Sequence, residues 1–307
     1  MAVDFSNVLV VGVSTRSLFN LEKENELYEK EGIAAYRRYQ LDHENEPLEH
    51  GTAFALVRNL LKLNELSKTR LVEVVVMSRN SPETGVRVLH SLKAHGLDIT
   101  RLALTGGEPL APYIQAYDID LFLSKDAMDV QNVIDSGQCA AAMLYAPPAI
   151  GLKEDSKVRI AFDADAVLFS DESELRFKTE GLDAFQAFER ENEKVSLNEG
   201  PFAKLLLKLS LLQSQIPLDI EDSPLCLAIV TARSAPSHMR VINTLRAWGV
   251  YVNQTFFLGG LPKDKVLQAF GAHIFFDDQE YHLDAASKVV PSGKVPYNSN
   301  SLLRNKP

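Results

Sequence analysis

The sequence predicts an α/β fold in which a mainly parallel sheet is flanked by helices. Apolar runs bounded by turn residues alternate with amphipathic stretches, the pattern of strands and crossover helices. The runs are continuous in Val, Ile and Leu, which is typical of parallel strands covered on both faces. A third observation is an internal repeat, which divides the 307 residues into two copies of one α/β unit.

Each predicted strand is one apolar run. In chain order the runs are VLVVGV (8–13), VEVVVM (72–77), DLFLS (120–124), AAMLY (141–145), VRIAF (158–162), LCLAIVTA (225–232) and HIFFDD (273–278). The first run has neither a basic segment before it nor a cleavage site after it, so we expect a strand and not a signal peptide.

Periodicity and the position of Pro262 predict three helices, and the absence of periodicity marks the C-terminal tail. Residues 84–95 and 238–248 have helical spacing, and Pro262 is suited to the first position of a helix that reads PKDKVLQAF. The polar tail from Pro296 lacks periodicity, and we expect it to be loosely held.

The repeat relates two helical segments and several strand ends. RVLHSLKAHG (87–96) and RVINTLRAWG (240–249) share five identities at an offset of 153, and upstream the offset slips by about three. The Pro- and Gly-containing stretch 145–158 separates the copies. We therefore expect a degenerate N-terminal half at 1–150 and a catalytic half at 151–307.

Composition excludes several function classes. The net charge of −9 disfavours a nucleic acid polymer as partner, since polymer binding needs clustered Lys and Arg. No run reaches the roughly 20 apolar residues of a membrane span. Two cysteines in a chain of this size indicate a reducing compartment, so a cytoplasmic location is expected.

Acidic side chains gather at the predicted strand ends of the second half. Asp163 and Asp165 follow VRIAF, Thr231 ends the next strand, Lys263 follows GGLP, and HIFF ends in Asp277 and Asp278. Ligands bind at the carboxyl ends of the strands in an open parallel sheet, so these side chains should converge. The first half has Val13, Thr15, Ser78, Leu110, Ser124 and Lys125 at the corresponding positions, so the fold does not need the acids and we expect the chemistry in the second half.

Several carboxylates in one small site repel each other unless a cation is present. Mg²⁺ binds oxygen ligands of this kind and often carries a substrate phosphate. One carboxylate could then attack phosphorus, while Lys263 and Thr231 hold the phosphoryl oxygens. A bound phosphate would also explain a lysine near a helix N-terminus, where the helix dipole disfavours a cation.

Simpler interpretations stand beside these predictions. The Asp163 and Asp165 pair could be a helix cap or a turn, and Arg233 could bind the substrate phosphate or base or be an exposed loop residue. The charged segment of about 171–200 could be a small helical cap over the site or a solvated crossover helix.

The set D-x-D-x-V (163–167), Thr231, Lys263 and Asp277-Asp278 resembles the four motifs of the haloacid dehalogenase (HAD) superfamily of phosphotransferases. More narrowly, FDADAVLFSDESE, VTARSA, LRAWG, FFLGGLPK, HIFFDDQ and the stretch 36–54 resemble the cytosolic 5′-nucleotidases of type I. The family usually has Gly where this chain has Ala164. A backbone conformation that only Gly can adopt at this position would therefore conflict with Ala164.

The resemblance implies a HAD-like Rossmannoid sheet and Mg²⁺-dependent hydrolysis of nucleoside 5′-monophosphates, AMP favoured. It implies Asp163 as nucleophile and metal ligand, and Asp165 as general acid and base with its backbone carbonyl on the metal. Thr231 and Lys263 would bind phosphate, Asp277 would bind the metal directly, and Asp278 would act through water or by orienting Lys263. Another small phosphomonoester as substrate, or a non-catalytic nucleotide-binding module, stays an alternative, and a homo-oligomer is left open.

Overall fold

A computed structural model describes residues 4–149, 155–220 and 222–304. Ten strands form one sheet in the order β10-β9-β8-β11-β12-β7-β6-β1-β4-β5. Neighbouring strands run parallel, except that β12 and β7 pair antiparallel. The strands are β1 (Leu9–Ser14), β4 (Val72–Ser78), β5 (Arg101–Leu104), β6 (Leu121–Ser124), β7 (Ala140–Leu144), β8 (Val158–Phe162), β9 (Leu225–Thr231), β10 (Gln254–Phe257), β11 (Ile274–Asp277) and β12 (Ser292–Lys294).

The predicted α/β class is confirmed, and the arrangement is consistent with a HAD-like Rossmannoid fold. The two halves share this one sheet and have the same strand order outward from the joint, β12-β11-β8-β9-β10 and β7-β6-β1-β4-β5. A duplicated unit would give this shared order, although the duplication itself stays a prediction. The boundary proposed at residues 150 and 151 lies outside the described residues.

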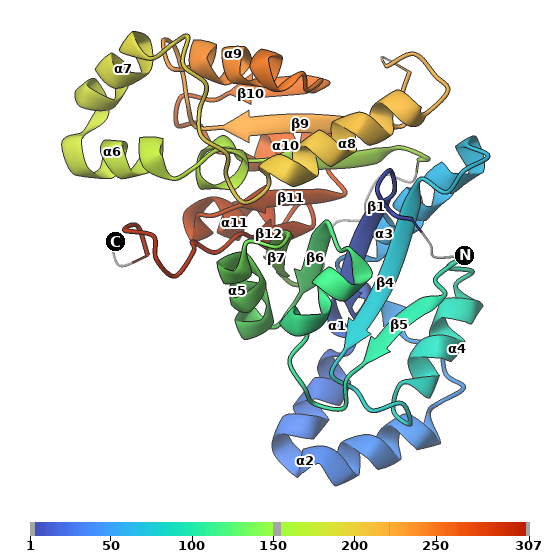
Figure 1. Ribbon diagram of the computed structural model, residues 1–307. Coiled ribbons are helices and arrows are strands. Elements are labelled where there is room, and N and C mark those ends of the chain that lie inside the picture. The colour runs from blue at the N-terminus through green and yellow to red at the C-terminus, as the bar shows by residue number, and fades with distance from the viewer. Residues whose placement is uncertain (1–3, 150–154, 221, 305–307) are drawn as a thin grey trace.

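Helices flank both faces of the sheet and extend beyond its strand ends (Figure 1). The first half contains α1 (Thr15–Leu18), α2 (Glu22–Asp42), α3 (Phe54–Lys62), α4 (Val86–Ala94), α5 (Ala127–Ser136), the short helices η1 (Leu63–Leu66), η2 (Ala111–Tyr113) and η3 (Gln115–Tyr117), and the small hairpin β2 (Phe19–Asn20) and β3 (Glu49–His50). The second half contains η4 (Ala164–Leu168), α6 (Glu172–Glu180), α7 (Leu182–Glu191), α8 (Ala203–Gln215), α9 (His238–Trp248), α10 (Asp264–Phe270) and α11 (Glu280–Ala286).

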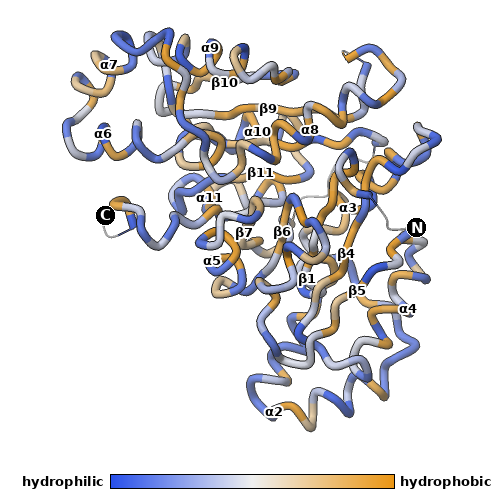
Figure 2. The backbone as a smooth tube through the Cα atoms, viewed as in Figure 1, coloured by the Kyte–Doolittle hydropathy of each residue, from blue (hydrophilic) through white to orange (hydrophobic). Residues whose placement is uncertain are grey.

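The core lies along the central strands. β1, β4 and β11 are buried along their whole length. Hydrophobic stretches follow β4, β9 and β11 in Figure 2. One cluster of buried side chains includes residues from both halves, so the halves fold around a shared core. None of the described helices is both long and apolar enough to cross a membrane.

Two local expectations are wrong. The helix after Pro262 begins at Asp264, so Lys263 is its N-cap residue and not part of its first turn. The tail from Pro296 is held by hydrogen bonds: Gln131 Nε2 donates to the carbonyl of Tyr297 at 3.0 Å, and the Ser299 N–H donates to Asp135 Oδ1 at 2.7 Å. Polar side chains on other elements therefore fix a segment whose own sequence has no periodic signal.

Candidate active site at the strand ends of the second half

The register of β8 and β11 brings the predicted acids together. Phe162 pairs with Phe276, so Asp163 and Asp277, the next residue on each strand, lie side by side. The Asp163 N–H donates to the carbonyl of Phe276 at 2.8 Å, which fixes the chain as it leaves β8. Asp163, Asp277 and Asp278 are buried. The strand-end rule therefore places three carboxylates in one desolvated site, as predicted.

The turn after Asp163 accommodates the alanine that departs from the family pattern. Ala164 does not have a positive φ, whereas Ala166 has a φ of 57°. The left-handed residue thus lies two positions later, next to Asp165, and Ala at 164 carries no backbone strain.

Lys263 is the cation of this cluster. Its Nζ lies 2.9 Å from Asp163 Oδ1 and donates to Asp277 Oδ2 at 2.7 Å. Its side chain is 1% exposed, and burial opposes the charged form, but the two carboxylates outweigh burial and raise the pKa of Lys263. Lys263 is therefore a fixed positive charge, as a phosphate-binding lysine must be.

One lysine does not balance three carboxylates. Burial raises the pKa of Asp163 to about 6 against the effect of Lys263, with Asp277 adding to the rise. Burial and then the charges of Asp277, Glu174 and Asp163 raise the pKa of Asp278 well above its usual range. With all three carboxylates ionised, the site would carry excess negative charge, which a second cation would relieve.

The oxygen atoms fit such a cation. Asp163, Asp277 and Asp278 each offer one carboxylate oxygen, and these atoms lie within 4.8 Å of one another. Asp163 Oδ1 and Asp278 Oδ1 receive no well-aligned hydrogen bond from the described residues. An all-oxygen set of this kind suits Mg²⁺. The Asp165 carboxylate, also predicted to contribute to a metal site, is held elsewhere, so a metal contact from Asp165 would use its backbone carbonyl.

Thr231 is buried at the end of β9, the strand that pairs with β8. Its Oγ1 accepts a hydrogen bond from the Arg233 N–H at 3.2 Å, and in the first half Ser78 Oγ accepts one from the Asn80 N–H at 3.1 Å. The hydroxyl therefore shapes the same turn in both halves. Its own hydrogen can still donate to an oxyanion, so the turn role and the predicted phosphate contact are compatible.

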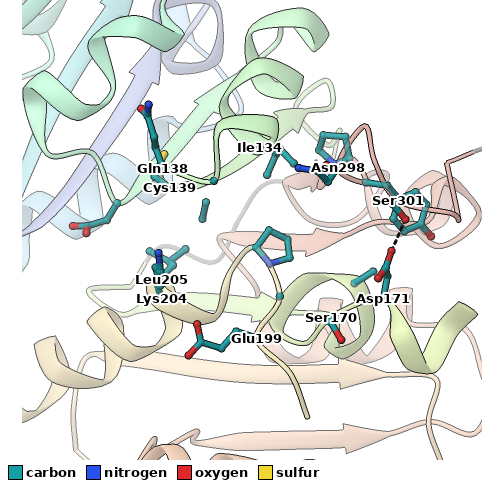
Figure 3. A pocket seen from close by; sticks show the side chains of 18 of the residues that line it. Ile134, Gln138, Cys139, Ser170, Asp171, Glu199, Lys204, Leu205, Asn298 and Ser301 are labelled. Carbon is teal, nitrogen blue, oxygen red and sulfur yellow. Dashed lines mark hydrogen bonds between the residues drawn. The ribbon is translucent and has the colours of Figure 1, made fainter.

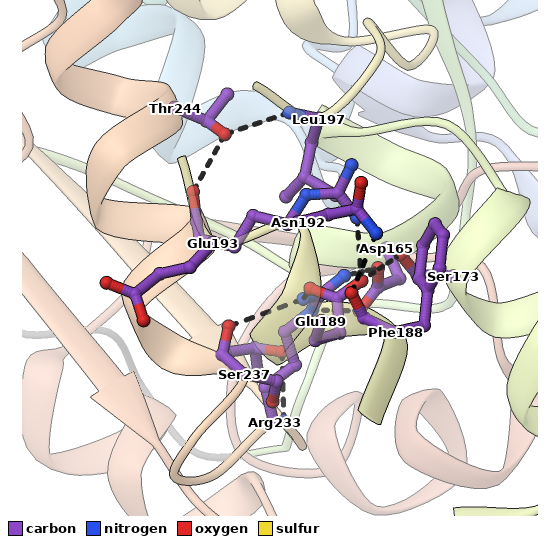
Figure 4. Close-up of polar contacts among 12 residues, drawn as sticks. Asp165, Ser173, Phe188, Glu189, Asn192, Glu193, Leu197, Arg233, Ser237 and Thr244 are labelled. Carbon is purple, nitrogen blue, oxygen red and sulfur yellow. Dashed lines mark hydrogen bonds and ion pairs between the residues drawn. The ribbon is translucent and has the colours of Figure 1, made fainter. Parts of the chain in front are cut away.

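The interpretation of Arg233 as an exposed loop residue is wrong, since it is 4% exposed. Its Nε donates to Asp165 Oδ2 at 2.8 Å and its Nη2 donates to Asp165 Oδ1 at 2.6 Å, a bidentate pair. Its Nη1 donates to Glu189 on α7 (Figure 4). The Arg233 guanidinium also lies over the Phe185 ring, 5.4 Å from the ring centroid. Arg233 thus links Asp165, the predicted general acid and base, to α7, which is part of the segment expected to be the cap.

Sequence reasoning missed three residues of the site. Glu189 also accepts from Ser173 Oγ at 2.9 Å and from Arg240 Nη1 at 3.0 Å. Glu174 on α6 accepts from the Tyr297 hydroxyl at 3.1 Å, and the same hydroxyl contacts Asp278 Oδ2. Burial raises the pKa of Glu174, whereas Lys178 opposes the rise. Nothing in the local sequence marks Glu189 or Tyr297. For Glu174, the available signal was Glu24 at the same offset of about 150 in the first half.

A cavity of about 430 Å³ lies between the two halves, next to the turn that carries Asp165. Figure 3 shows Gln138 and Cys139 of the first half facing Lys204 and Leu205 of the second. Ala166 and Tyr297 line it as well, so it borders the acid cluster. The three clustered carboxylates do not line it, and it is therefore a neighbour of the candidate active site.

Comparison with known proteins agrees with the motifs. The family model described as 5′-nucleotidase matches residues 1–302. Cytosolic 5′-nucleotidase 1B of Homo sapiens is 37% identical over 305 residues, an alignment that covers 95% of this chain and 49% of that protein. The chain thus spans about half the length of this curated relative. No solved structure gives a significant match.

Proposed function

We propose, from the premise that this chain belongs to the 5′-nucleotidase family, that it hydrolyses nucleoside 5′-monophosphates to nucleoside and phosphate. The observation that carries the proposal is the buried cluster of Asp163, Asp277 and Asp278 around Lys263 at adjacent strand ends. Such a cluster is costly to bury. The fold does not need it, because the first half has the same strand order without these acids. We further propose AMP as the favoured substrate, Mg²⁺ as the metal and a cytoplasmic location for the protein. The half-buried cysteines Cys139 and Cys226 are free, which suits a reducing compartment.

Each residue has a step that its position allows. An Asp163 oxygen attacks phosphorus, the bond from phosphorus to the nucleoside 5′ oxygen breaks, and Asp165 gives that oxygen a proton. Water then attacks the aspartyl-phosphate, its proton goes to Asp165, and phosphate leaves with Asp163 restored. Lys263 and Thr231 hold the phosphoryl oxygens throughout. Asp163, Asp277 and Asp278 would hold Mg²⁺, which would supply positive charge to offset the charge of the phosphoryl group.

Asp165 must move to do this work. Arg233 occupies both of its carboxylate oxygens in the conformation described here. Turning Asp165 toward the nucleoside oxygen breaks at least one of these hydrogen bonds, and substrate binding would have to offset the loss. Arg233 is accordingly placed to position the acid, and the phosphate contact predicted for Arg233 stays part of the proposal.

The test is phosphate release from AMP, IMP, CMP, UMP and glucose 6-phosphate with Mg²⁺ and with EDTA. We expect metal-dependent release biased toward nucleotides, and a loss of about a thousandfold or more in Asp163→Asn at unchanged folding. Asp183→Asn, an exposed aspartate on α7, is the matched control. Release from glucose 6-phosphate alone would favour the broader phosphatase. AMP binding without any release would favour the non-catalytic module, and full activity in Asp163→Asn would exclude the assigned nucleophile.

A further inference from the structure

A second cavity, of about 410 Å³, lies at the strand ends of the first half. It is lined by Ser14, Thr15, Ser78, Ser124 and Lys125 at the ends of β1, β4 and β6, together with residues of α2. These strands take the places in the first half that β8, β9 and β11 take around the acid cluster. The cavity therefore lies at the position in its half where the candidate active site lies in the other.

A kinked helix, α2, lines this cavity, and α6 and α7 contact residues of the candidate active site. The kink in α2 is at Gly32, with φ 81° and ψ −175°, and α6 and α7 meet at Gly181, with φ 85° and ψ 180°. The two glycines are about 150 residues apart, the offset that relates the upstream parts of the halves. Figure 1 shows α2 beyond the ends of β4 and β5. The first half thus retains a helix-lined cavity at its strand ends without the acids.

The chemistry of the cavity is that of an anion site. Where the second half has Asp277 and Asp278, this half has Ser124 and Lys125. Three buried donor atoms of its lining residues lack a hydrogen-bond acceptor among the described residues: Arg16 Nε, Arg79 Nε and Asn80 Nδ2. Unpaired buried donors are costly, and an anion placed among them would supply the missing acceptors.

The carboxylates in the same lining already have partners. Glu24 pairs with Arg87 at 2.8 Å, and Asp129 pairs with Arg79 at 2.5 Å. Asp126 accepts from the Asp129 N–H at 2.8 Å and caps α5. Lys125 pairs with Glu22 at 2.5 Å, and its side chain is 10% exposed. The balance of free hydrogen-bonding capacity in the cavity is therefore on the donor side.

An aromatic wall lies beside these donors. Tyr28 and Tyr36 pack edge to face with their centroids 6.0 Å apart, and Tyr28 is 49% exposed. The Tyr36 hydroxyl donates to Asn80 Oδ1 at 3.0 Å, which turns the Asn80 amide so that its nitrogen is left unpaired. Met77, Leu21 and Ile33 complete an apolar part of the lining. A half-exposed tyrosine ring next to anion donors is suited to a base joined to a phosphate.

We propose that the cavity between α2 and the ends of β1, β4 and β6 binds a nucleoside 5′-monophosphate without hydrolysing it and without a divalent metal. The positions that match Asp163, Asp165, Asp277 and Asp278 hold Val13, Thr15, Ser124 and Lys125, so none of these four positions offers a carboxylate as nucleophile or metal ligand. The choice of a nucleoside phosphate rests on the proposed function, whereas the anion-binding character rests on the unpaired donors alone.

The experiment is hydrogen–deuterium exchange and calorimetric titration of full-length Asp163→Asn with AMP in EDTA. We expect AMP to slow exchange in α2 (Glu22–Asp42), and the Arg16→Gln/Arg79→Gln pair to weaken that binding by about tenfold or more. Arg38→Gln, an exposed arginine of α2 outside the cavity lining, should leave it unchanged. Slowed exchange confined to residues 163–200, or no slowing at all, would overturn the proposal.

Inorganic phosphate and adenosine, titrated separately, test the identity of the ligand. Weaker binding of each than of AMP is expected, and phosphate that binds as tightly as AMP would overturn the nucleotide assignment. Failure of the proposed function would appear differently, as absent phosphate release by the unaltered chain in Mg²⁺ while AMP still protects α2.

Discussion

Replacing Glu189 with Ala tests whether the polar network between α7 and the turn that carries Asp165 (the acid turn, residues 163–168) stabilises the second half. Glu189 has a fully buried side chain and accepts from Ser173, Arg233 and Arg240. The side chains of Arg233 and Arg240 are 2% and 5% exposed. The substitution therefore leaves two buried cations without their shared anion and opens a cavity where the carboxylate was.

The expected cost follows from what each arginine retains. Removing one partner of a buried ion pair typically costs about 3–5 kcal/mol. Arg233 keeps Asp165, and Arg240 keeps its hydrogen bond to the Val195 carbonyl at 2.9 Å, so we expect the lower end of that range. With a urea m value of about 3 kcal/mol/M, a loss of about 3 kcal/mol lowers the unfolding midpoint by about 1 M.

The measurement is urea unfolding followed by tryptophan fluorescence. Trp248 is the single tryptophan of the chain, ends α9 and packs against Phe169 with ring centroids 5.4 Å apart, so it reports on this half. Glu191→Ala removes an exposed carboxylate from the same helix and should change the midpoint by about 0.2 M or less. A Glu189→Ala midpoint equal to that of Glu191→Ala would refute the reasoning.

Two further predictions concern the shared core and the acid turn. His273 accepts from the Arg159 N–H at 3.0 Å and faces Asn59 of the first half, and burial lowers its pKa from 6.5 to about 4. The unfolded chain therefore takes up this proton first, so the contribution of His273 is present above pH 6.5 and up to about 3 kcal/mol is lost as the pH falls toward 4. His273→Gln should reduce the loss in unfolding free energy between about pH 7 and 5, and an unchanged loss would contradict the assignment. A Cβ on Gly200 would lie 2.3 Å from the Phe169 carbonyl oxygen, so Gly200→Ala should destabilise by more than about 2 kcal/mol, against about 1 for Gly96→Ala, where nothing lies within 4 Å; equal midpoint shifts would contradict this.

Continuous apolar runs in the sequence predicted the buried strands. The strands without such a run, β5, β10 and β12, were missed. The seven predicted runs correspond to β1, β4, β6, β7, β8, β9 and β11. β5 and β10 are the edges of the sheet and are half-exposed, so no continuous apolar run marks them. β12 is three residues, Ser-Gly-Lys, and becomes a strand only because β11 and β7 pair with it. That pairing joins the halves and depends on contacts far apart in the chain.

The same division applies to the candidate site. Asp163, Thr231, Lys263, Asp277 and Asp278 were predicted because each follows or ends a recognisable strand or turn, and a strand end has a known place in a parallel sheet. The sequence identified Arg233 as a candidate site residue but did not predict its burial, because its partners Asp165 and Glu189 come from other segments. Glu189 and Tyr297 lie on a charged helix and in a polar tail, where local sequence is typical of solvated surface.

The network also bears on whether segment 171–200 is a cap or a crossover. A solvated crossover would place its charges in water, yet Glu189 and Glu174 are buried and reach Arg233 and Tyr297. Through these two residues, α7 is joined to Asp165 and α6 to Asp278. Any displacement of α6 and α7 must therefore break or re-form hydrogen bonds to both carboxylates. This coupling favours the cap, because it makes the position of the helices and the readiness of the acid interdependent.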